Sequence, residues 1–271
     1  MKIFAKISGR VILGLLLLLT LSPFYLLVIN AFKPQKEIIM NPFMLAAQWR
    51  FVNFEKAFSQ VARPMMNSFV VTFAVIILTI ILSVLAAYAF VRFTFKGSRI
   101  LYYGIIAMLM IPGFVMLIPQ FIQISELKLY NTYWGLILPP TSYSVAMGTF
   151  LTRGSMEGLP KSLFEAAEIE GAGDMAILMK VAAPLSKPII ATMTIMTGLS
   201  AWNNYLWPLV AATGEKTQQI AVALTKMVTS VNDGNGVLFS GYIIASMPLI
   251  ILFCFASKSF VAGLTQGSVK G

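Results

Sequence analysis

The residues that usually carry enzymatic chemistry are scarce in this sequence. Its 271 residues include no histidine, which removes the commonest general base and the commonest metal ligand. Ser-His and Cys-His nucleophilic pairs are excluded for the same reason. The single cysteine, Cys254, lies in an apolar run, so it cannot form a disulfide within the chain and is poorly placed for a zinc site. No catalytic residue and no metal site are predicted.

Nucleotide chemistry is also not expected from this chain. A loop that cradles nucleotide phosphates needs two spaced glycines followed directly by Lys and Ser or Thr. The nearest segment, Gly214-Glu215-Lys216-Thr217, lacks both the upstream glycine and the adjacent Gly-Lys pair. We therefore predict that the chain is not an enzyme and has no cofactor of its own.

One long polar segment, residues 153–187, has the pattern of two short helices. Pro160 suits the first turn of a helix, and Gly171 suits the point where that helix stops. Asp174 has the side chain of a helix cap and would begin a second helix that ends before Pro184. The segment is therefore predicted to be two helices joined at a Gly-Ala-Gly corner.

The first of these helices has small side chains on one face. Helical spacing groups four residues there: Leu163, Ala166, Ala167 and Glu170. Small side chains on such a face let another backbone or side chain approach closely. Ser162 and Glu165 have the spacing of a capping box, which would stabilise the helix without any partner protein. Both roles are compatible, because a capped helix is a stiffer docking element.

The elements that must position this segment are membrane helices. The chain is 58% hydrophobic and only 11% charged, whereas soluble domains have about 25% charged residues. Each charge-free run exceeds the roughly 20 residues needed to cross a bilayer core. These runs predict spans at about 11–32, 65–91, 100–125, 132–152, 188–211 and 237–257. The predicted fold is an all-α membrane protein of about six transmembrane helices in one domain, 1–271.

Several helix breakers lie within these predicted spans, among them Pro112-Gly113, Pro139-Pro140 and Gly198. Proline and glycine are common in membrane helices, so we interpret them as kinks, packing sites or points of flexing. The apolar stretch from Ile38 to Trp49 is too short to span, and we expect it at the outer interface of the membrane.

Positive charge predicts the orientation of the chain. The net charge of +10 comes from short clusters that flank apolar runs, which is typical of a membrane protein and not of a nucleic-acid-binding surface. With a cytoplasmic N-terminus, about twelve Lys and Arg residues lie inside and about eight outside. Arg92, Lys96 and Arg99 cluster in one short inner loop, where the bias counts most. Both termini and the 153–187 segment are therefore expected in the cytoplasm.

The inner segment resembles a known family signature. Glu165-Ala166-Ala167, followed by Gly171, Val181 and Pro184 at the family spacing, is similar to the EAA loop of binding-protein-dependent ABC importer permeases. The chain departs from that pattern at Ala183, where the family usually has Leu, and at Glu170, where it commonly has Asp. The segments 202–209 and 263–271 resemble the shorter permease of the maltose-type carbohydrate group.

The resemblance implies a type I ABC importer-like transmembrane domain in a bacterial or archaeal cytoplasmic membrane. Its expected partners are membrane lipid, a second permease in a heterodimer, a sugar-binding protein outside, and an ATPase dimer that binds ATP and Mg²⁺. The residues implied in ATPase docking are Glu165, Ala166, Ala167, Glu170, Gly171, Asp174 and Pro184.

Two further groups of residues are candidates for function. Asn203, Asn204 and Tyr205 would line the sugar path, although interhelical hydrogen bonds or an aromatic belt would explain the same residues. The polar outer loop with Asn232, Asp233 and Asn235 matches the family loop that reaches the binding protein.

The alternative function is a secondary transporter or channel without an ATPase partner. Such proteins usually couple to ions through ionisable residues inside the membrane. None lies in the six predicted spans, so the sequence favours the importer. It does not specify the sugar.

Overall fold

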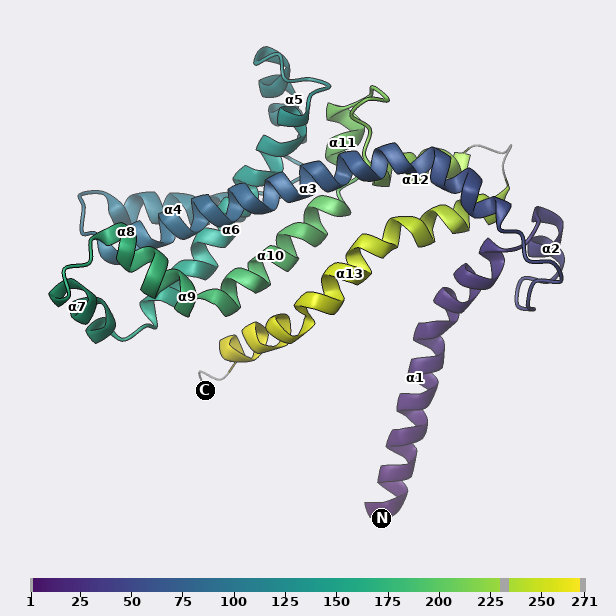
Figure 1. The fold of residues 1–271 in the computed structure, drawn as a ribbon, viewed down its shortest axis with the longest axis horizontal. Coiled ribbons are helices and arrows are strands. Elements are labelled where there is room, and N and C mark those ends of the chain that lie inside the picture. The colour runs from purple at the N-terminus through teal and green to yellow at the C-terminus, as the bar shows by residue number, and fades with distance from the viewer. Residues whose placement is uncertain (1, 230–233, 269–271) are drawn as a thin grey trace. The chain divides into compact units, whose positions relative to one another are not determined.

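The computed structural model describes the backbone of residues 2–229 and 234–268, and the side chains of residues 9–229 and 234–254. All regular secondary structure in these residues is helical (Figure 1). This confirms the predicted all-α class. The chain divides into two compact units, Met1–Met65 with Val222–Met247, and Met66–Ala221 with Pro248–Gly271. The prediction of a single domain over 1–271 stays a prediction.

The first unit is built around the end of the first helix. It contains α1 (Lys2–Ala31), α2 (Gln35–Met40), the start of α3 (Val52–Arg92), most of α12 (Ile220–Thr229) and the start of α13 (Asn235–Ser268). The last carbonyls of a helix have no partner within it. Here the Ala31 carbonyl accepts hydrogen bonds from Asn53 Nδ2 at 2.8 Å and from Ser240 Oγ at 3.2 Å, which joins α1, α3 and α13.

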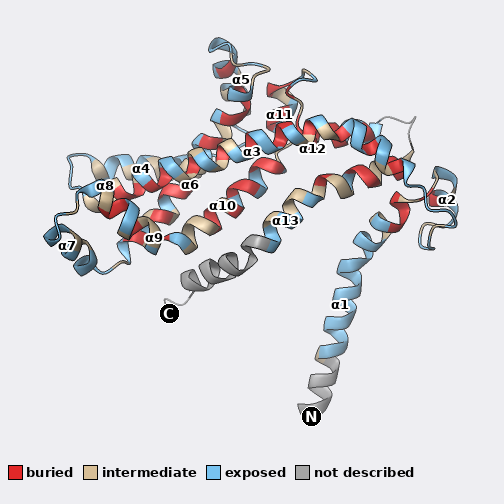
Figure 2. Ribbon diagram, viewed as in Figure 1, coloured by how far each residue is buried: buried red, intermediate tan, exposed pale blue. Residues whose placement is uncertain are grey.

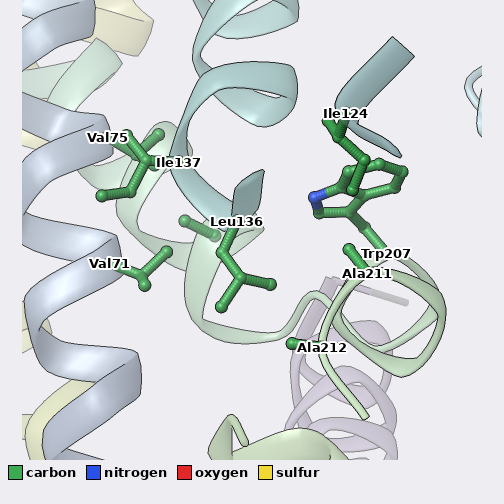
Figure 3. Close-up of a cluster of buried hydrophobic side chains, with 9 residues drawn as sticks. Val71, Val75, Ile124, Leu136, Ile137, Trp207, Ala211 and Ala212 are labelled. Carbon is green, nitrogen blue, oxygen red and sulfur yellow. The ribbon is translucent and has the colours of Figure 1, made fainter. Parts of the chain in front are cut away.

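The second unit packs the long part of α3 against a set of shorter helices. These are α4 (Ser98–Leu109), α5 (Leu117–Glu126), α6 (Tyr133–Glu157), α10 (Lys187–Trp202) and α11 (Leu206–Ala211). One apolar cluster includes Val71, Leu136 and Trp207 (Figure 3). The buried indole Nε1 of Trp207 donates to the Gly135 carbonyl at 3.0 Å, so the polar group of this ring has a partner.

Two glycines allow close packing in the second unit. A Cβ at Gly135 would meet the Leu129 carbonyl, and a Cβ at Gly148 would lie 2.7 Å from Ser83 Oγ. Gly148 therefore marks a close approach of α6 to α3, and Met193 of α10 lies against the same site. The segment between α6 and α10 folds as α7 (Lys161–Ile169), α8 (Asp174–Ile177), a π-helical turn (Leu178–Ala182) and α9 (Ala183–Leu185).

Several of the predicted spans coincide with long apolar helices. Within the described residues, three helices are long and apolar enough to cross a membrane: Gly9–Ala31, Val52–Arg92 and Asn235–Cys254. A fourth results if Asp174–Leu185 and Lys187–Trp202, bent by 76°, are taken as one span. The predicted spans 11–32, 65–91 and 237–257 thus fall on single apolar helices.

Two predicted spans are broken. The run 100–125 divides into α4 and α5, because the chain leaves the helix around Pro112 and Gly113. The run 188–211 divides into α10 and α11 at residues 203–205. The run 132–152 does lie within one helix, α6, although Pro139 and Pro140 are inside it.

Candidate functional site: the coupling segment

The 153–187 segment is called the coupling segment below, after the role that the family resemblance implies. Its first short helix begins without a side-chain cap. Pro160 is the capping residue of α7, with φ −59° and ψ 127°, and no side chain caps the helix. The predicted Ser162–Glu165 capping box is therefore wrong, because Ser162 already lies in the first helical turn. Glu165 is exposed.

The end of α7 is as predicted and depends on Gly171. This residue has φ +81°, in the left-handed region that favours glycine. Its N–H donates to the Glu168 carbonyl at 2.9 Å, and the Ala172 N–H donates to the Ala167 carbonyl at 3.0 Å. These two bonds form a Schellman motif, which satisfies orphan carbonyls and turns the chain sharply.

Asp174 has a different role from the one predicted. The capping residue of α8 is Gly173, and no side chain caps that helix. The Asp174 carboxylate instead accepts a hydrogen bond from Arg92 Nε at 3.1 Å. The same guanidinium forms an ion pair with Glu168 of α7. Arg92, at the end of α3, thus binds one carboxylate on each of the two short helices.

The helix after the corner also runs further than predicted. It does not end before Pro184 but continues through the π-helical turn and α9 to Leu185. The wider π-helical turn lies directly before Pro184, where an α-helix would lose a hydrogen bond. The chain then bends by 76° into α10, so the coupling segment is joined directly to a helix of the second unit.

The inner face of the segment is apolar and packed. Phe164, Ala167 and Ala172 contact a buried cluster that includes Tyr88 and Ile177. Of the predicted small face, Ala167 points inward, whereas Ala166 and Glu170 are exposed. The segment is therefore held by its own apolar face, while most residues of α7 are exposed and pale blue in Figure 2.

Sequence reasoning missed part of that exposed face. Ile169 is 87% exposed, Met175 64% and Met179 63%. Large apolar side chains that protrude beside carboxylates are typical of a protein-binding surface. Their apolar character was readable in the sequence, but their direction was not.

A second arginine joins the helices next to the segment. Arg153 of α6 pairs with Glu157 at 2.7 Å and lies 3.7 Å from the ring centroid of Tyr102 of α4. The Phe90 ring of α3 is 5.8 Å from the same guanidinium. The ends of α3, α4 and α6 are thereby connected through one cation.

A hollow of about 470 Å³ lies between these helix ends and α7. Its walls combine both signs of charge, with Arg92, Lys161, Glu157, Glu165 and Glu168 among the lining residues. The hollow separates the exposed part of α7 from the helix ends, so α7 is attached mainly through its apolar face and Arg92.

The residues predicted for a sugar path lie at the break between α10 and α11. Asn203 is exposed and donates back to the Leu199 carbonyl at 3.0 Å. Asn204 accepts a hydrogen bond from the Trp207 N–H at 3.3 Å and lines a hollow of about 280 Å³. Asn203 and Tyr205 are not in its wall.

The wall of this second hollow mixes aromatic rings with small polar groups. Besides Asn204, it includes Gln120, Tyr143, Ser144, Ser200 and Trp207. The hollow lies at the breaks between α4 and α5 and between α10 and α11, beside the two prolines of α6. Backbone breaks at membrane depth are tolerated where they line a cavity.

The third predicted group is only partly described. Asn232 and Asp233 lie outside the described residues. Asn235 is exposed at the start of α13, and its N–H donates to Gln35 Oε1 at 2.7 Å. It therefore joins α13 to α2 within the first unit.

The sequence is similar to those of known transport proteins. The sequence model of the family "Binding-protein-dependent transport system inner membrane component" matches residues 79–266. The probable ABC transporter permease protein YurM of Bacillus subtilis is 34% identical over 97% of this chain and 88% of its own length. The arabinooligosaccharides transport system permease protein AraQ of Halalkalibacterium halodurans is 32% identical over 92% of this chain and 91% of its own length.

The fold is similar to that of a solved transporter. A chain of a bacterial ABC transporter involved in the import of the acidic polysaccharide alginate superposes with a TM-score of 0.85. The match covers 96% of this chain and 97% of that one, at 24% sequence identity. At this identity the likeness shows the fold alone.

Proposed function

Since the chain belongs to the family of binding-protein-dependent transport system inner membrane components, we propose that it is a permease subunit of an ATP-driven sugar importer and that its coupling segment transmits ATPase closure to the membrane helices. The observation that carries the proposal is the exposed face of α7, fixed at the Gly171 corner and by Arg92. Relatives named for oligosaccharide transport support the sugar class.

The proposed docking surface is the outer side of the coupling segment. Glu165, Ala166 and Glu170 are exposed there, and Gly171 and Asp174 form the corner. Ala167 and Pro184 contribute from within, through packing and through the joint to α10. A partner that moves this surface would therefore act on α10 through the bend after Leu185.

The energy for transport comes from partners in this proposal. ATP and Mg²⁺ are bound by a separate ATPase dimer, and the closure of that dimer moves α7. ATP can shift the permease between inward-open and outward-open packings only if the ATPase contacts differ in the two. The coupling segment is the part of this chain suited to such contacts, because one face is anchored and the other is free.

The proposed importer also includes a sugar path, a second permease and an external sugar-binding protein. The hollow that Asn204 lines is proposed as part of the sugar path, with Asn203 and Tyr205 beside it. A second permease completes the channel, and an external sugar-binding protein delivers substrate to the loop that includes Asn232, Asp233 and Asn235. Both termini and the coupling segment are placed in the cytoplasm, following the charge bias of the loops.

A substitution at the corner tests the coupling role. Gly171→Asp forces a side chain into left-handed backbone at φ +81°, whereas the matched control Gly173→Asp adds the same charge two residues away at φ −75°. No atom lies within 4 Å of a Cβ at either glycine, so the backbone conformation is the main difference. We expect the Gly171→Asp importer to insert and hydrolyse ATP but to lose sugar uptake, and the control to keep uptake.

The measurements are ATP hydrolysis and labelled-sugar uptake by the complex reconstituted in liposomes. Normal uptake by the Gly171→Asp complex would refute the coupling role. A secondary transporter or channel predicts something different, namely that no ATPase co-purifies with the chain and that uptake continues without ATP.

A further inference from the structure

Two hollows of the second unit share one stretch of wall. The larger, of about 280 Å³, is the one that Asn204 lines, and it is called the Asn204 hollow below. The smaller, of about 130 Å³, lies between α6 and α10 and is called the methionine hollow. Its wall includes three methionines: Met147, Met193 and Met196. Three residues line both hollows: Tyr143, Ser144 and Ser200.

The methionine hollow lies nearer to the coupling segment. Helix α6 runs toward that segment, and α10 starts directly after it. On α6, the wall of the Asn204 hollow ends at Ser144, whereas the wall of the methionine hollow continues to Leu151. On α10, the methionine hollow begins at Met193 and reaches Ser200, where the Asn204 hollow begins. The two hollows therefore follow one another along the same pair of helices.

The polar side chains of the shared wall have no hydrogen-bond partner among the described residues. Hydroxyls on membrane helices commonly donate to the carbonyl four residues earlier, as Thr141 does on α6 and Thr194 does on α10. The hydroxyls of Tyr143, Ser144 and Ser200 make no such bond within the described part of the chain. Unpaired polar groups are unfavourable against lipid tails, so this wall is suited to water or a polar ligand.

Among the described residues, no charged side chain lines either of these two hollows. The hollow beside α7 is different, because its wall includes both signs of charge. A carboxylate or phosphate that leaves water for a wall without cations loses hydration that nothing replaces. An uncharged sugar loses less, because the amides of Gln120 and Asn204 and the three hydroxyls of the shared wall can exchange hydrogen bonds with it.

We propose that the two hollows are successive parts of one path and that this path selects uncharged sugars over charged ones. This rests on the proposed function, because that function supplies the sugar. Tyr143 is 46% exposed at the junction of the two hollows and presents its ring to the apolar face of a passing sugar. The methionine hollow adds mainly flexible apolar contacts, which let the sugar leave toward the end of the path nearer to the coupling segment.

Cysteine labelling tests the charge preference without knowledge of the sugar. Cys254 is the single cysteine, so Ser144→Cys in a Cys254→Ser background gives the chain one thiol. The complete permease–ATPase complex, in nanodiscs that leave both faces open to water, is treated with one of two reagents of similar size. Hydroxyethyl methanethiosulfonate is neutral, and sulfonatoethyl methanethiosulfonate is an anion. Ser125→Cys is the matched control, because Ser125 is exposed and lies near one acidic residue, Glu126, and one basic residue, Lys128.

Mass spectrometry of this chain measures the labelling rates. We expect the ratio of the neutral to the anionic rate at position 144 to exceed the ratio at position 125 by roughly tenfold or more, because the wall does not replace the hydration of the anion. Met196→Cys, which reports on the methionine hollow alone, should show the same preference. Equal ratios at positions 144 and 125 would overturn the charge preference while the importer stands. Labelling at position 125 but by neither reagent at position 144 would overturn the path, since the hollow would then be closed to water.

A cation added to the shared wall gives a second measurement. Ser200→Lys, combined with Ser144→Cys, should raise the anionic labelling rate at position 144 roughly tenfold through charge attraction. Ser200→Gln, which is long but uncharged, should not raise it. An unchanged anionic rate with Ser200→Lys would show that the preference is not electrostatic and would overturn the proposal. A complex of the unmodified chain from which the ATPase is missing would remove the proposed function, and this inference with it.

Discussion

Arg92 contacts two short helices through one guanidinium group. It was notable only as part of the basic cluster with Lys96 and Arg99 that predicts orientation. In the structure it pairs with Glu168 of α7 and Asp174 of α8. The side chains of Arg92, Glu168 and Asp174 are 31%, 41% and 51% exposed. The two ion pairs therefore orient α7 and α8 but contribute little to the free energy of unfolding.

Arg92→Gln should therefore affect coupling more than stability. Exposed ion pairs each contribute about 0–1 kcal/mol, so the melting temperature in detergent should fall by only a few degrees. Sugar uptake per ATP hydrolysed should fall clearly, because α7 and α8 lose their common anchor. Arg99→Gln, at the exposed start of α4, is the control. Equal coupling in both variants would contradict the anchor.

Asn204 is the residue of its predicted group that lines a hollow. Asn204→Ala should raise the KM of the reconstituted importer for its sugar roughly threefold to tenfold, the effect of losing one or two hydrogen bonds. Asn203→Ala, whose side chain bonds back to the Leu199 carbonyl, should leave KM unchanged. An equal change in both variants would favour a structural role for the pair over a sugar contact.

At the scale of elements, the second unit depends on the approach of α3, α6 and α10 at Gly148. A Cβ at this position would lie 2.7 Å from Ser83 Oγ and even closer to the Met193 sulfur. Ser83 and Met193 are themselves buried, so the site has little room to relax.

Gly148→Ala should lower the stability of the detergent-solubilised protein by about 1–3 kcal/mol, the usual effect of overpacking. Gly104→Ala is the matched control, because Gly104 is also helical and has no atom within 4 Å of its Cβ position. That control should be neutral or gain up to about 1 kcal/mol. Thermal unfolding of both variants measures the difference, and equal melting temperatures would argue against a tight contact at Gly148.

For the whole molecule, the expected absence of a phosphate loop has a direct consequence. The purified chain alone should hydrolyse no ATP, whereas the complex that co-purifies with its ATPase should do so and should take up sugar. A phosphate-release assay on both samples makes the comparison. Hydrolysis by the chain alone would contradict the proposed division of labour among the subunits.

The corner of the coupling segment could be predicted from the sequence because its causes are local. Glycine is favoured where backbone is left-handed, so Gly171 marked the end of α7 without any knowledge of the fold. The all-α class could also be predicted from the sequence, because the hydropathy of a membrane helix and its lack of charge depend only on the residues of that helix.

Other features were set by contacts between distant residues. The break between α10 and α11 at residues 203–205 contains no proline, whereas α6 continues through Pro139 and Pro140, so the positions of the prolines do not by themselves locate the breaks. Asp174 could have capped α8, but an arginine 82 positions earlier in the chain is placed to bind it instead.

The sequence by itself thus determined that the chain is helical, lies in a membrane and turns sharply at Gly171, because backbone preference and transfer into lipid depend on neighbouring residues. Only the tertiary structure decided which face of α7 is free, which cation holds it and that Lys33 is buried while Phe43 is exposed. Those outcomes depend on pairs of residues far apart in the chain, and the spacing of residue types along a sequence does not specify such pairs.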